Sequence, residues 1–367
     1  MKKRIGIDAR LISQSGIGRY INNLLINIAK IDMKNEYFVF LLRKDLDKIS
    51  LPENFSKIEA NISWYSLKEQ TALPKILNKY NLDLVHFPHF NVPIFYKRNF
   101  VVTVHDLIHQ HFQMRKASTL DPLTYKIKQL GYKQVFKNAI NKSLKIIVPS
   151  NYVKKLLMME WKVKDEKIIV TYEAADDRIF AGPGFKPKIN FPYIFYIGNA
   201  HPHKNVEGLI EAFLQLKKDS SAEELKLVLA GKDHYFWKRI KDKYTDENIK
   251  YVGFITDSEL ASYYKGARCY VLPSLEEGFG IPMLEAFAGK CPVAASNIGA
   301  LREIVKDAAL YFDPKNIENM SQTIKKILDD KELRKKLIEK GSVRCKEFSW
   351  KKLTEKTLEV YAGSYCS

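Results

Sequence analysis

The sequence predicts an α/β protein built from two doubly wound domains, each with a sheet flanked by helices. Short apolar runs alternate with amphipathic stretches along the whole chain, which is typical of successive βαβ units. A length of 367 residues is enough for two domains with separate cores. Glycine and proline crowd an unpatterned segment at residues 175–192, which indicates a linker between the two.

The first domain, residues 1–174, is expected to follow this alternation from its first strand. Runs rich in β-branched and aromatic residues indicate strands, and a 3.6-residue apolar period indicates helices. The predicted strands are residues 5–8, 37–42, 58–64, 84–86, 101–104, 146–148 and 168–172. The predicted helices are residues 17–29, 67–79, 123–141 and 152–160.

The second domain, residues 193–348, repeats the pattern, and a helical tail follows at residues 349–367. The predicted strands are residues 193–198, 225–230, 251–254, 270–272, 293–295 and 310–312. The predicted helices are residues 206–216, 236–243, 258–264, 282–288, 317–329, 332–345 and, in the tail, 351–361.

The most informative motif is a loop that joins a strand to a helix in the second domain. Two carboxylates, Glu277 and Glu285, bracket it with seven residues between them. Gly278 and Gly280 allow the backbone to approach a ligand, and the free N–H groups of a helix starting near Ile281 can bind an anion. A phosphate cradle between two hydroxyl-binding acids predicts a nucleotide-sugar site, and a pair of solvated acids is the alternative.

A lysine, Lys204, opens the helix that follows the first strand of the second domain. Beside a helix N-terminus, its ammonium group can bind a diphosphate as a point charge. His203 precedes it and would lose any positive charge as pH rises past the histidine range. A lysine on the surface at a helix start is the alternative interpretation.

Two further clusters lie at strand ends of the first domain. Gly16 and Gly18 stand between the first strand and the first helix, where a purely structural turn is the alternative to a ligand-binding loop. Histidines and an aspartate recur in the segments Val-His-Phe-Pro-His and Val-His-Asp-Leu-Ile-His, but without the spacing of a helical zinc motif, so we expect no metal.

These motifs, in this order, resemble those of the GT-B retaining glycosyltransferases of family 4 (group 1). The resemblance covers residues 5–361 and includes Gly-Ile-Gly-Arg-Tyr, Thr-Val-His-Asp-Leu, the Glu-x7-Glu element and a Gly-x-x-x-Pro-x-Lys-Asn loop. That loop departs from the family pattern, with His203 at the usual arginine and His201 at the usual acid. The resemblance implies two Rossmann-like domains facing across a cleft, with a C-terminal helix crossing back to the N-terminal domain.

The resemblance also implies residue roles. The N-terminal domain would bind the acceptor, and the C-terminal domain the nucleotide sugar, with Glu277 on the sugar and Glu285 on the ribose. The implied catalytic residues are His105, Asp106, Lys204 and Glu277. The implied donor-binding residues are Gly16, Gly18, His203, Lys204, Glu277, Gly278, Phe279, Gly280, Ile281 and Glu285. The implied acceptor-binding residues are His86 and His89, which alternatively pack in the interior.

The function implied is metal-independent transfer of a hexose, without a cofactor, to a saccharide or lipid-linked saccharide acceptor. The subset with these motifs looks like mannosyltransferases of bacterial surface polysaccharides such as lipopolysaccharide, so GDP-mannose is the leading donor and a UDP-hexose the alternative. A phosphorylase or an epimerase of the same fold, and a nonenzymatic protein that binds anionic surfaces, stay open at this point.

The charge of the chain is +18, and most of it lies in the first half. Residues 97–145 carry ten Lys and Arg against two Asp, with apolar residues between them. A solvated helix face, a surface for anionic lipid headgroups or a lipid-diphosphate acceptor, and nucleic acid are the three interpretations. We expect no nucleic acid, because the stretch is not interleaved with exposed aromatics or glycine-rich repeats that would stack bases.

The expected location is cytoplasmic, with peripheral attachment at the inner face of the membrane as an open alternative. No apolar run approaches the roughly 18 residues that span a bilayer, and the first residues lead into a strand without an apolar leader. Four cysteines without C-x-x-C spacing are expected to be free thiols.

Overall fold

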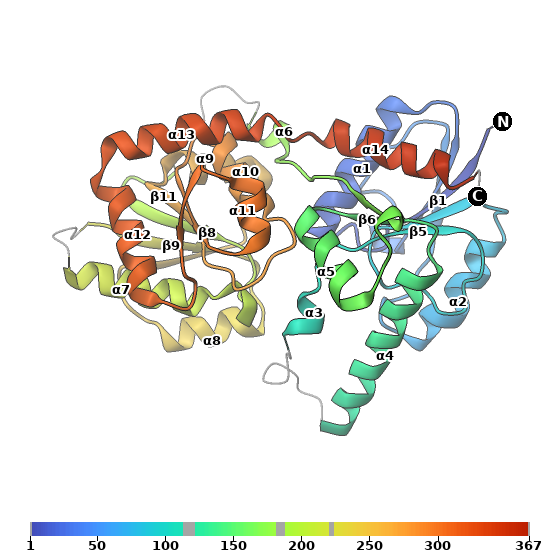
Figure 1. Ribbon diagram of the computed structural model, residues 1–367, viewed down its shortest axis with the longest axis horizontal. Coiled ribbons are helices and arrows are strands. Elements are labelled where there is room, and N and C mark those ends of the chain that lie inside the picture. The colour runs from blue at the N-terminus through green and yellow to red at the C-terminus, as the bar shows by residue number, and fades with distance from the viewer. Residues whose placement is uncertain (1, 113–121, 181–187, 220–223, 366–367) are drawn as a thin grey trace. The chain divides into compact units, whose positions relative to one another are not determined.

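The computed structural model describes residues 2–112, 122–180, 188–219 and 224–365 and divides the chain into two compact units (Figure 1). Unit 1 comprises Met1–Gln110, Ser118–Glu173 and Trp350–Ser367, and unit 2 comprises His111–Ala117 and Ala174–Ser349. Each unit contains one parallel sheet, so the predicted α/β class with two Rossmann-like units is confirmed.

Unit 1 contains a seven-stranded parallel sheet within the described residues. Its strands are β1 Arg4–Asp8, β2 Glu36–Leu41, β3 Phe55–Glu59, β4 Leu84–Phe87, β5 Phe100–Thr103, β6 Ile146–Val148 and β7 Ile168–Val170. Their order is β3-β2-β1-β4-β5-β6-β7, with β1 paired to β2 on one side and β4 on the other. Strand order therefore reverses between β1 and β4, where ligands of doubly wound sheets bind.

The helices of unit 1 cover this sheet, and the last of them comes from the C-terminal tail. They are α1 Ile17–Ile31, α2 Leu67–Asn78, α4 Pro122–Lys142, α5 Asn151–Trp161 and α14 Trp350–Gly363. The short α3, Ile108–His111, lies where the chain passes from unit 1 to unit 2. Helix α14 packs against α1, so the predicted return of the C-terminal helix to the first domain is confirmed.

Unit 2 contains a six-stranded parallel sheet within the described residues, ordered β10-β9-β8-β11-β12-β13. Its strands are β8 Tyr193–Ile197, β9 Lys226–Ala230, β10 Ile249–Gly253, β11 Cys269–Leu272, β12 Val293–Ser296 and β13 Ala309–Phe312. Its helices are α6 Asp177–Phe180, α7 Val206–Asp219, α8 Tyr235–Lys243, α9 Asp257–Gly266, α10 Ile281–Ala288, α11 Gly299–Val305, α12 Ile317–Asp329 and α13 Lys331–Cys345. Here the strand order reverses between β8 and β11.

Local chemistry explains why these elements begin where they do. The side chain of Ser66 accepts the N–H of Glu69 at 3.2 Å and caps α2, and Ser150 caps α5 in the same way through Val153. The central strands are apolar on both faces because helices cover both sides of a parallel sheet. The run Tyr193–Ile197 is an example, with four of its five residues fully buried.

The structure differs from the sequence prediction in a few segments. The strand predicted at residues 58–64 is β3, Phe55–Glu59. The chain beyond it is irregular, and there the Ile62 carbonyl accepts a hydrogen bond from the Arg10 guanidinium. Helices α3, α6 and α11 were not predicted, since all three are too short to show a period. Helix α6 lies in the segment expected to be a linker.

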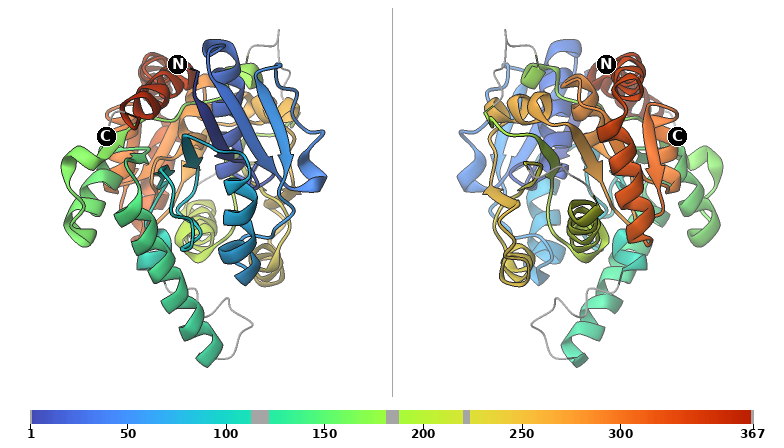
Figure 2. Two further views of the ribbon diagram at one scale, coloured as in Figure 1. Left: turned by 90° about the vertical axis from the view of Figure 1, so that its right-hand side faces the viewer. Right: turned by 90° about the vertical axis from the view of Figure 1, so that its left-hand side faces the viewer.

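Hydrophobic cores form separately in the two units. Among the described residues no helix is long and apolar enough to cross a membrane. Cys269, Cys291 and Cys345 are free thiols, as expected. The fourth cysteine, Cys366, lies outside the described residues. Figures 1 and 2 show α4 extending beyond the sheet of unit 1, with its first turns farthest from the strands.

Candidate active site

The predicted diphosphate lysine and the first predicted acid meet where strand order reverses in unit 2. Lys204 follows β8, and Glu277 follows the neighbouring strand β11. The Lys204 ammonium donates to Glu277 Oε1 at 2.7 Å, and the Ser274 hydroxyl donates to the same oxygen at 2.6 Å. Both charged side chains are largely buried, so the site presents one cation and one anion with little solvent around them.

Backbone contacts hold the two loops together. The Asn205 side-chain amide donates to the carbonyls of Pro273 at 3.1 Å and Pro314 at 2.8 Å. The N–H of Leu275 donates to the His203 carbonyl at 2.7 Å. The lysine and the glutamate are therefore positioned by a fixed framework, as a preorganised site requires.

Helix α10 begins directly after this loop. Gly280, its N-cap, has φ of 97°, a left-handed conformation that L side chains rarely adopt. A Cβ there would lie 2.7 Å from Met283 Cε and 2.9 Å from Leu301 Cδ2. Ile281 is partly exposed at the helix start, where unsatisfied N–H groups can receive an anion.

Three other predicted donor-binding residues of this loop and helix are buried. Glu285 is 4% exposed, and one of its oxygens accepts the Tyr264 hydroxyl at 3.0 Å. Gly278 is buried, and the Phe279 ring packs edge-on against Phe348 at 5.8 Å. The structure therefore shows Phe279 in a packing contact, while Glu285 lies one turn into α10, fixed by a tyrosine that sequence reasoning missed.

His203 belongs to a row of three imidazole rings beside the lysine. Its ring stacks on His201 with centroids 5.9 Å apart, and His201 stacks on His234 at 5.3 Å. Burial lowers the pKa of His234, with Asp233 opposing the shift. The histidine at the usual arginine position is thus next to Lys204 and almost fully buried.

In unit 1 the predicted catalytic histidine is hydrogen-bonded at both ring nitrogens. His105 Nδ1 lies 3.0 Å from Glu173 Oε1, and its Nε2 lies 2.9 Å from the Pro88 carbonyl. Burial alone would lower the pKa of His105, but the hydrogen bond and charge of Glu173 outweigh it, so the pKa is raised. Asp106 accepts the N–H of Ile108 at 3.0 Å and so orients the chain after β5.

The two predicted acceptor histidines have different environments. His86 is fully buried, with Nδ1 at 2.6 Å from the Tyr361 hydroxyl and Nε2 at 2.8 Å from Thr103 Oγ1. Burial lowers its pKa to about 3, so it is neutral. The structure supports packing for His86 in place of an acceptor contact, because no surface of the ring is accessible. His89, by contrast, lines a recess at the end of β4.

The two glycines at the start of α1, its N-cap Gly16 and the helical Gly18, also differ from each other. Gly16 is exposed, with φ of 71° and no atom within 4 Å of an added Cβ. Gly18 is buried, and an added Cβ would lie 2.3 Å from the Ile12 carbonyl oxygen. A packing requirement is therefore shown for Gly18, whereas Gly16 is free to approach a ligand.

A second buried charge network follows β1, and sequence reasoning missed it. Asp8 Oδ2 and Glu69 Oε1 both accept from Arg10 Nη2 at 2.7 Å. The other Glu69 oxygen accepts the Asn91 amide at 2.6 Å and the Tyr65 N–H at 2.7 Å. The Asp-x-Arg spacing was the one local signal, since Glu69 is 59 residues away in the chain.

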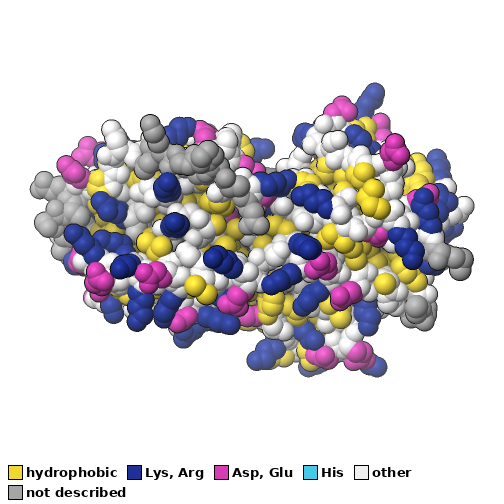
Figure 3. Space-filling view, turned by 90° about the horizontal axis from the view of Figure 1, so that it is seen from above, with side chains coloured by type: hydrophobic (Ala, Val, Ile, Leu, Met, Phe, Trp, Pro, Cys, Tyr) yellow, Lys and Arg dark blue, Asp and Glu magenta, His cyan; other side chains and the backbone are white. Residues whose placement is uncertain are grey.

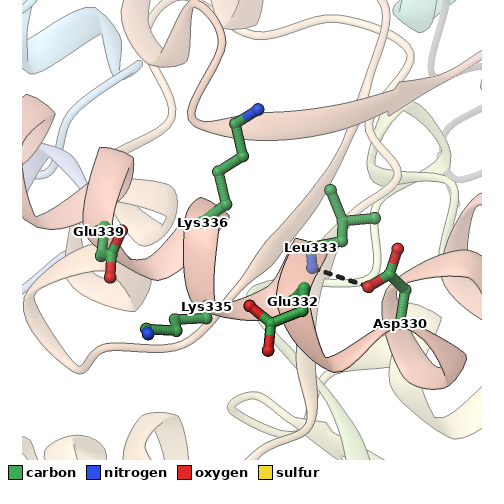
Figure 4. Close-up of a pocket in the computed structure, with 6 residues that line it drawn as sticks. All are labelled: Asp330, Glu332, Leu333, Lys335, Lys336 and Glu339. Carbon is green, nitrogen blue, oxygen red and sulfur yellow. Dashed lines mark hydrogen bonds between the residues drawn. The ribbon is translucent and has the colours of Figure 1, made fainter.

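A separate hollow on α13 lacks the features of a site (Figure 4). Asp330 accepts the N–H of Leu333 at 2.8 Å and caps the helix. The side chains of Glu332, Lys335, Lys336 and Glu339 are exposed and point in different directions in Figure 4. Within the described ranges, no group of three or more His, Cys, Asp or Glu could hold a metal ion.

Comparison with known families divides the chain in the same way as its two sheets. The family described as Glycosyltransferase Family 4 matches residues 15–178, and the family described as Glycosyl transferases group 1 matches residues 184–344.

Curated relatives extend over most of the chain. The O-antigen chain mannosyltransferase B of Escherichia coli is 28% identical over 95% of this chain and 96% of its own length. The O-antigen chain mannosyltransferase RfbU of Salmonella typhimurium is 27% identical over 72% of this chain and 70% of its own.

Solved structures share the fold at low identity. Sucrose-phosphate synthase from Thermosynechococcus elongatus superposes with a TM-score of 0.79 at 18% identity, over all of both chains. WaaG, a glycosyltransferase involved in lipopolysaccharide biosynthesis, has a TM-score of 0.74 at 14% identity, over 97% of this chain and 99% of WaaG.

Proposed function

Because the chain belongs to the GT-B glycosyltransferases of family 4 and group 1, we propose that it transfers a mannosyl group from GDP-mannose. The acceptor is a saccharide or lipid-linked saccharide, and the product is part of a surface polysaccharide. The similarity to O-antigen mannosyltransferases over nearly the full chain supports the choice of sugar. A UDP-hexose is the second candidate donor. Family membership also favours an enzyme over a nonenzymatic binding protein.

One observation carries this proposal, namely the Lys204–Glu277 pair at the strand reversal of unit 2. A nucleoside diphosphate requires a cation for its phosphates and carboxylates for its hydroxyl groups. Lys204 and the N-terminus of α10 supply the positive potential, Glu277 binds the sugar, and Glu285 binds the ribose. Gly16 and His203 are further proposed contacts of the diphosphate.

The proposed reaction retains the anomeric configuration and uses no metal. The bond between the anomeric carbon and the diphosphate oxygen breaks, and the acceptor hydroxyl oxygen bonds to the same face of that carbon. The acceptor proton passes to the departing phosphate, so no carboxylate nucleophile is needed. Lys204 and the α10 N–H groups stabilise the negative charge that develops on the leaving group. His105 is proposed to lie beside the reacting sugar, with Asp106 orienting the segment that carries it.

Thermal-shift measurements with GDP, UDP, ADP and their hexose conjugates test the donor assignment. A ligand that binds only the folded protein raises Tm, so we expect GDP-mannose to give the largest shift. Lys204→Met should weaken binding by about 10–100-fold, because hydrogen bonds to charged groups contribute about 1.5–3 kcal/mol. Lys335→Met, an exposed lysine of α13, is the matched control and should bind normally.

The outcomes separate the candidates. A larger Tm shift with a UDP-hexose than with GDP-mannose would identify the UDP-hexose as the donor. No Tm shift with any nucleotide would contradict the proposal. Product formation that persists after chelation with EDTA is expected for the metal-independent reaction. Loss of activity with EDTA and its recovery with a divalent cation would contradict that part.

A further inference from the structure

A small recess lies where strand order reverses in unit 1, at the carboxyl ends of β1 and β4. Asp8, Arg10, Trp64, Glu69, His89 and Asn91 are among the residues that line it. Its inner volume is about 10 Å³, enough for one water-sized group and too small for a sugar ring. Position and size together indicate a site that receives a single polar group from a larger ligand.

The charged residues of the recess leave two carboxylate oxygens, Asp8 Oδ2 and Glu69 Oε1, with one accepted hydrogen bond each. Asp8 Oδ1 accepts from the Arg10 backbone N–H at 3.3 Å and from Nε at 2.8 Å, while Oδ2 accepts from Nη2 at 2.7 Å. A carboxylate oxygen has two lone pairs, so Oδ2 has capacity for a second donor. Glu69 is fully buried, whereas Asp8 is 9% exposed and is the accessible acid.

His89 supplies a hydrogen-bond donor, whereas Asp8 supplies an acceptor. Its Nδ1 accepts the N–H of Asn91 at 3.3 Å, which puts the proton of a neutral imidazole on Nε2. Burial, together with the charges of His105 and His109, lowers the pKa of His89 well below 6.5, so the ring is neutral. His89 is nine-tenths buried, and among the residues that the structure describes its Nε2 makes no hydrogen bond.

A hydroxyl group satisfies both requirements at once, because it donates one hydrogen bond and accepts others. Trp64 adds a partly exposed aromatic wall of the kind against which an apolar ring face packs. A phosphate group would be repelled, since Asp8 and Glu69 outnumber the one guanidinium of Arg10. The chemistry of the recess thus selects a neutral sugar over an anionic group.

We propose that this recess binds one hydroxyl group of the acceptor sugar, a neutral hexose, which donates a hydrogen bond to Asp8 and accepts one from His89 Nε2. The assignment rests on the proposed function, in which unit 1 binds the acceptor. It adds Asp8 to the acceptor-binding residues and identifies a hexose ring, rather than a phosphate of a lipid carrier, as the group that lies at this strand edge.

Saturation-transfer NMR with methyl hexosides tests the proposal on the full-length protein. Methyl mannoside, glucoside and galactoside are compared first, and then the four monodeoxy analogues of the one that binds best. Wild type should lose about tenfold in affinity with one deoxy analogue, the effect of one lost hydrogen bond, and little with the others. Asp8→Asn and His89→Phe should bind the parent hexoside and that deoxy analogue equally.

The controls keep the result decisive. His109→Gln, an exposed histidine of the same unit, should discriminate like wild type. His89→Phe preserves the ring that packs on Phe90 and remains testable if Asp8→Asn unfolds, which the melting temperature will show. The proposal is wrong if no hexoside binds to wild type, if both variants retain wild-type discrimination, or if inorganic phosphate displaces the hexoside competitively.

Donor binding is measured on the same preparations. If the hexoside test fails but GDP-mannose raises Tm as expected, only the assignment of the recess is overturned. If the hexosides bind as expected but no nucleotide raises Tm, the proposed function is overturned and the recess remains a sugar-binding site.

Discussion

At the scale of single residues, the main feature of unit 2 is the pairing of Lys204 with Glu277 at 2.7 Å. A largely buried lysine without a counterion would be costly, and Glu277 with its Ser274 contact removes that cost. In the proposed complex the diphosphate would replace Glu277 as the partner of the Lys204 ammonium group. The sugar hydroxyl groups would replace Lys204 as the partners of the Glu277 carboxylate. Donor binding would then exchange one set of charge-assisted hydrogen bonds for another.

His105 and Glu173 make unit 1 sensitive to pH in a definite direction. Because the pKa of His105 is raised above its ordinary 6.5, the pair stabilises the fold fully below that pH. The contribution is lost as pH rises through the higher folded pKa. Glu173→Gln should therefore lower the free energy of unfolding more at pH 6 than at pH 9, as measured by urea denaturation.

The control for this prediction is a single exposed carboxylate, Glu318. Glu318→Gln, which removes a carboxylate from the start of α12, should change stability by about 0.5 kcal/mol or less at either pH. An equal loss at pH 6 and pH 9 in Glu173→Gln would show that His105 is not charged in the folded protein.

The sequence contained enough to select Lys204 and Glu277 as candidate site residues, because each lies in a short motif at the end of a strand. It could not reveal that Glu173 binds His105, since 68 residues separate them and nothing local marks the pairing. The same holds for Tyr264 on Glu285, 21 residues away. For His86 the sequence left acceptor binding and packing both open, because a histidine at a strand end can face the interior as well as a ligand.

At the scale of elements, the start of α10 depends on one glycine. Gly280→Ala would put a Cβ into Met283 and Leu301 at a left-handed φ, so we expect a loss of about 1–3 kcal/mol in the free energy of unfolding. Donor affinity should fall as well, because the N–H groups of the helix start would move. Urea denaturation and the GDP-mannose shift measure the two effects.

Gly131 provides a control for which we expect the opposite change in the free energy of unfolding. It lies exposed within α4, and an added Cβ would meet no atom within 4 Å. Gly131→Ala should raise the free energy of unfolding by about 0.5–1 kcal/mol through better helix propensity. Equal stability of the Gly280→Ala variant and wild type would show that the loop relaxes without cost.

The attachment of α14 to unit 1 depends on a buried hydrogen bond. Tyr361→Phe removes the hydroxyl 2.6 Å from His86 Nδ1 and leaves that nitrogen buried without its partner. We expect a loss of about 1–3 kcal/mol in unfolding free energy, the cost of an unsatisfied buried polar group. Tyr235→Phe, at an exposed tyrosine of α8, should be neutral. A neutral Tyr361→Phe would indicate that water replaces the hydroxyl.

The positions of strands and long helices could be predicted because buried parallel strands are continuously apolar and long helices show their period. Helix α11 could not, since seven residues starting at Gly299 give fewer than two periods. The order of strands was likewise hidden, because it depends on contacts between distant segments. The reversal points, and hence the recess beside Asp8, needed the structure.

At the scale of the whole molecule, the positive charge is not distributed uniformly over the surface. Figure 3 shows one face on which Lys and Arg outnumber Asp and Glu but are interspersed with them. Helix α4 differs, because Lys128, Lys133, Lys137 and Lys142 are exposed along it together with Leu130. Its later turns pack in the core of unit 1 through Phe136 and Ile140.

We propose that these lysines and the exposed leucine bind an anionic membrane surface, which their charge and apolar character fit. A triple Lys→Glu variant at 128, 133 and 137 should reduce binding to vesicles rich in anionic lipid by about 100-fold at low salt. Each lysine near such a surface contributes about 1 kcal/mol, so three losses give roughly two powers of ten. Cosedimentation with vesicles measures the effect, and added salt should abolish wild-type binding.

The matched control carries the same change in net charge at a different place. Lysines 331, 335 and 336 of α13 are exposed, and changing all three to glutamate should leave most vesicle binding intact. An equal loss in both triple variants would mean that overall charge, and not α4, drives association. Binding of wild type to neutral vesicles would point instead to Leu130, and the Leu130→Ser variant would then lose it.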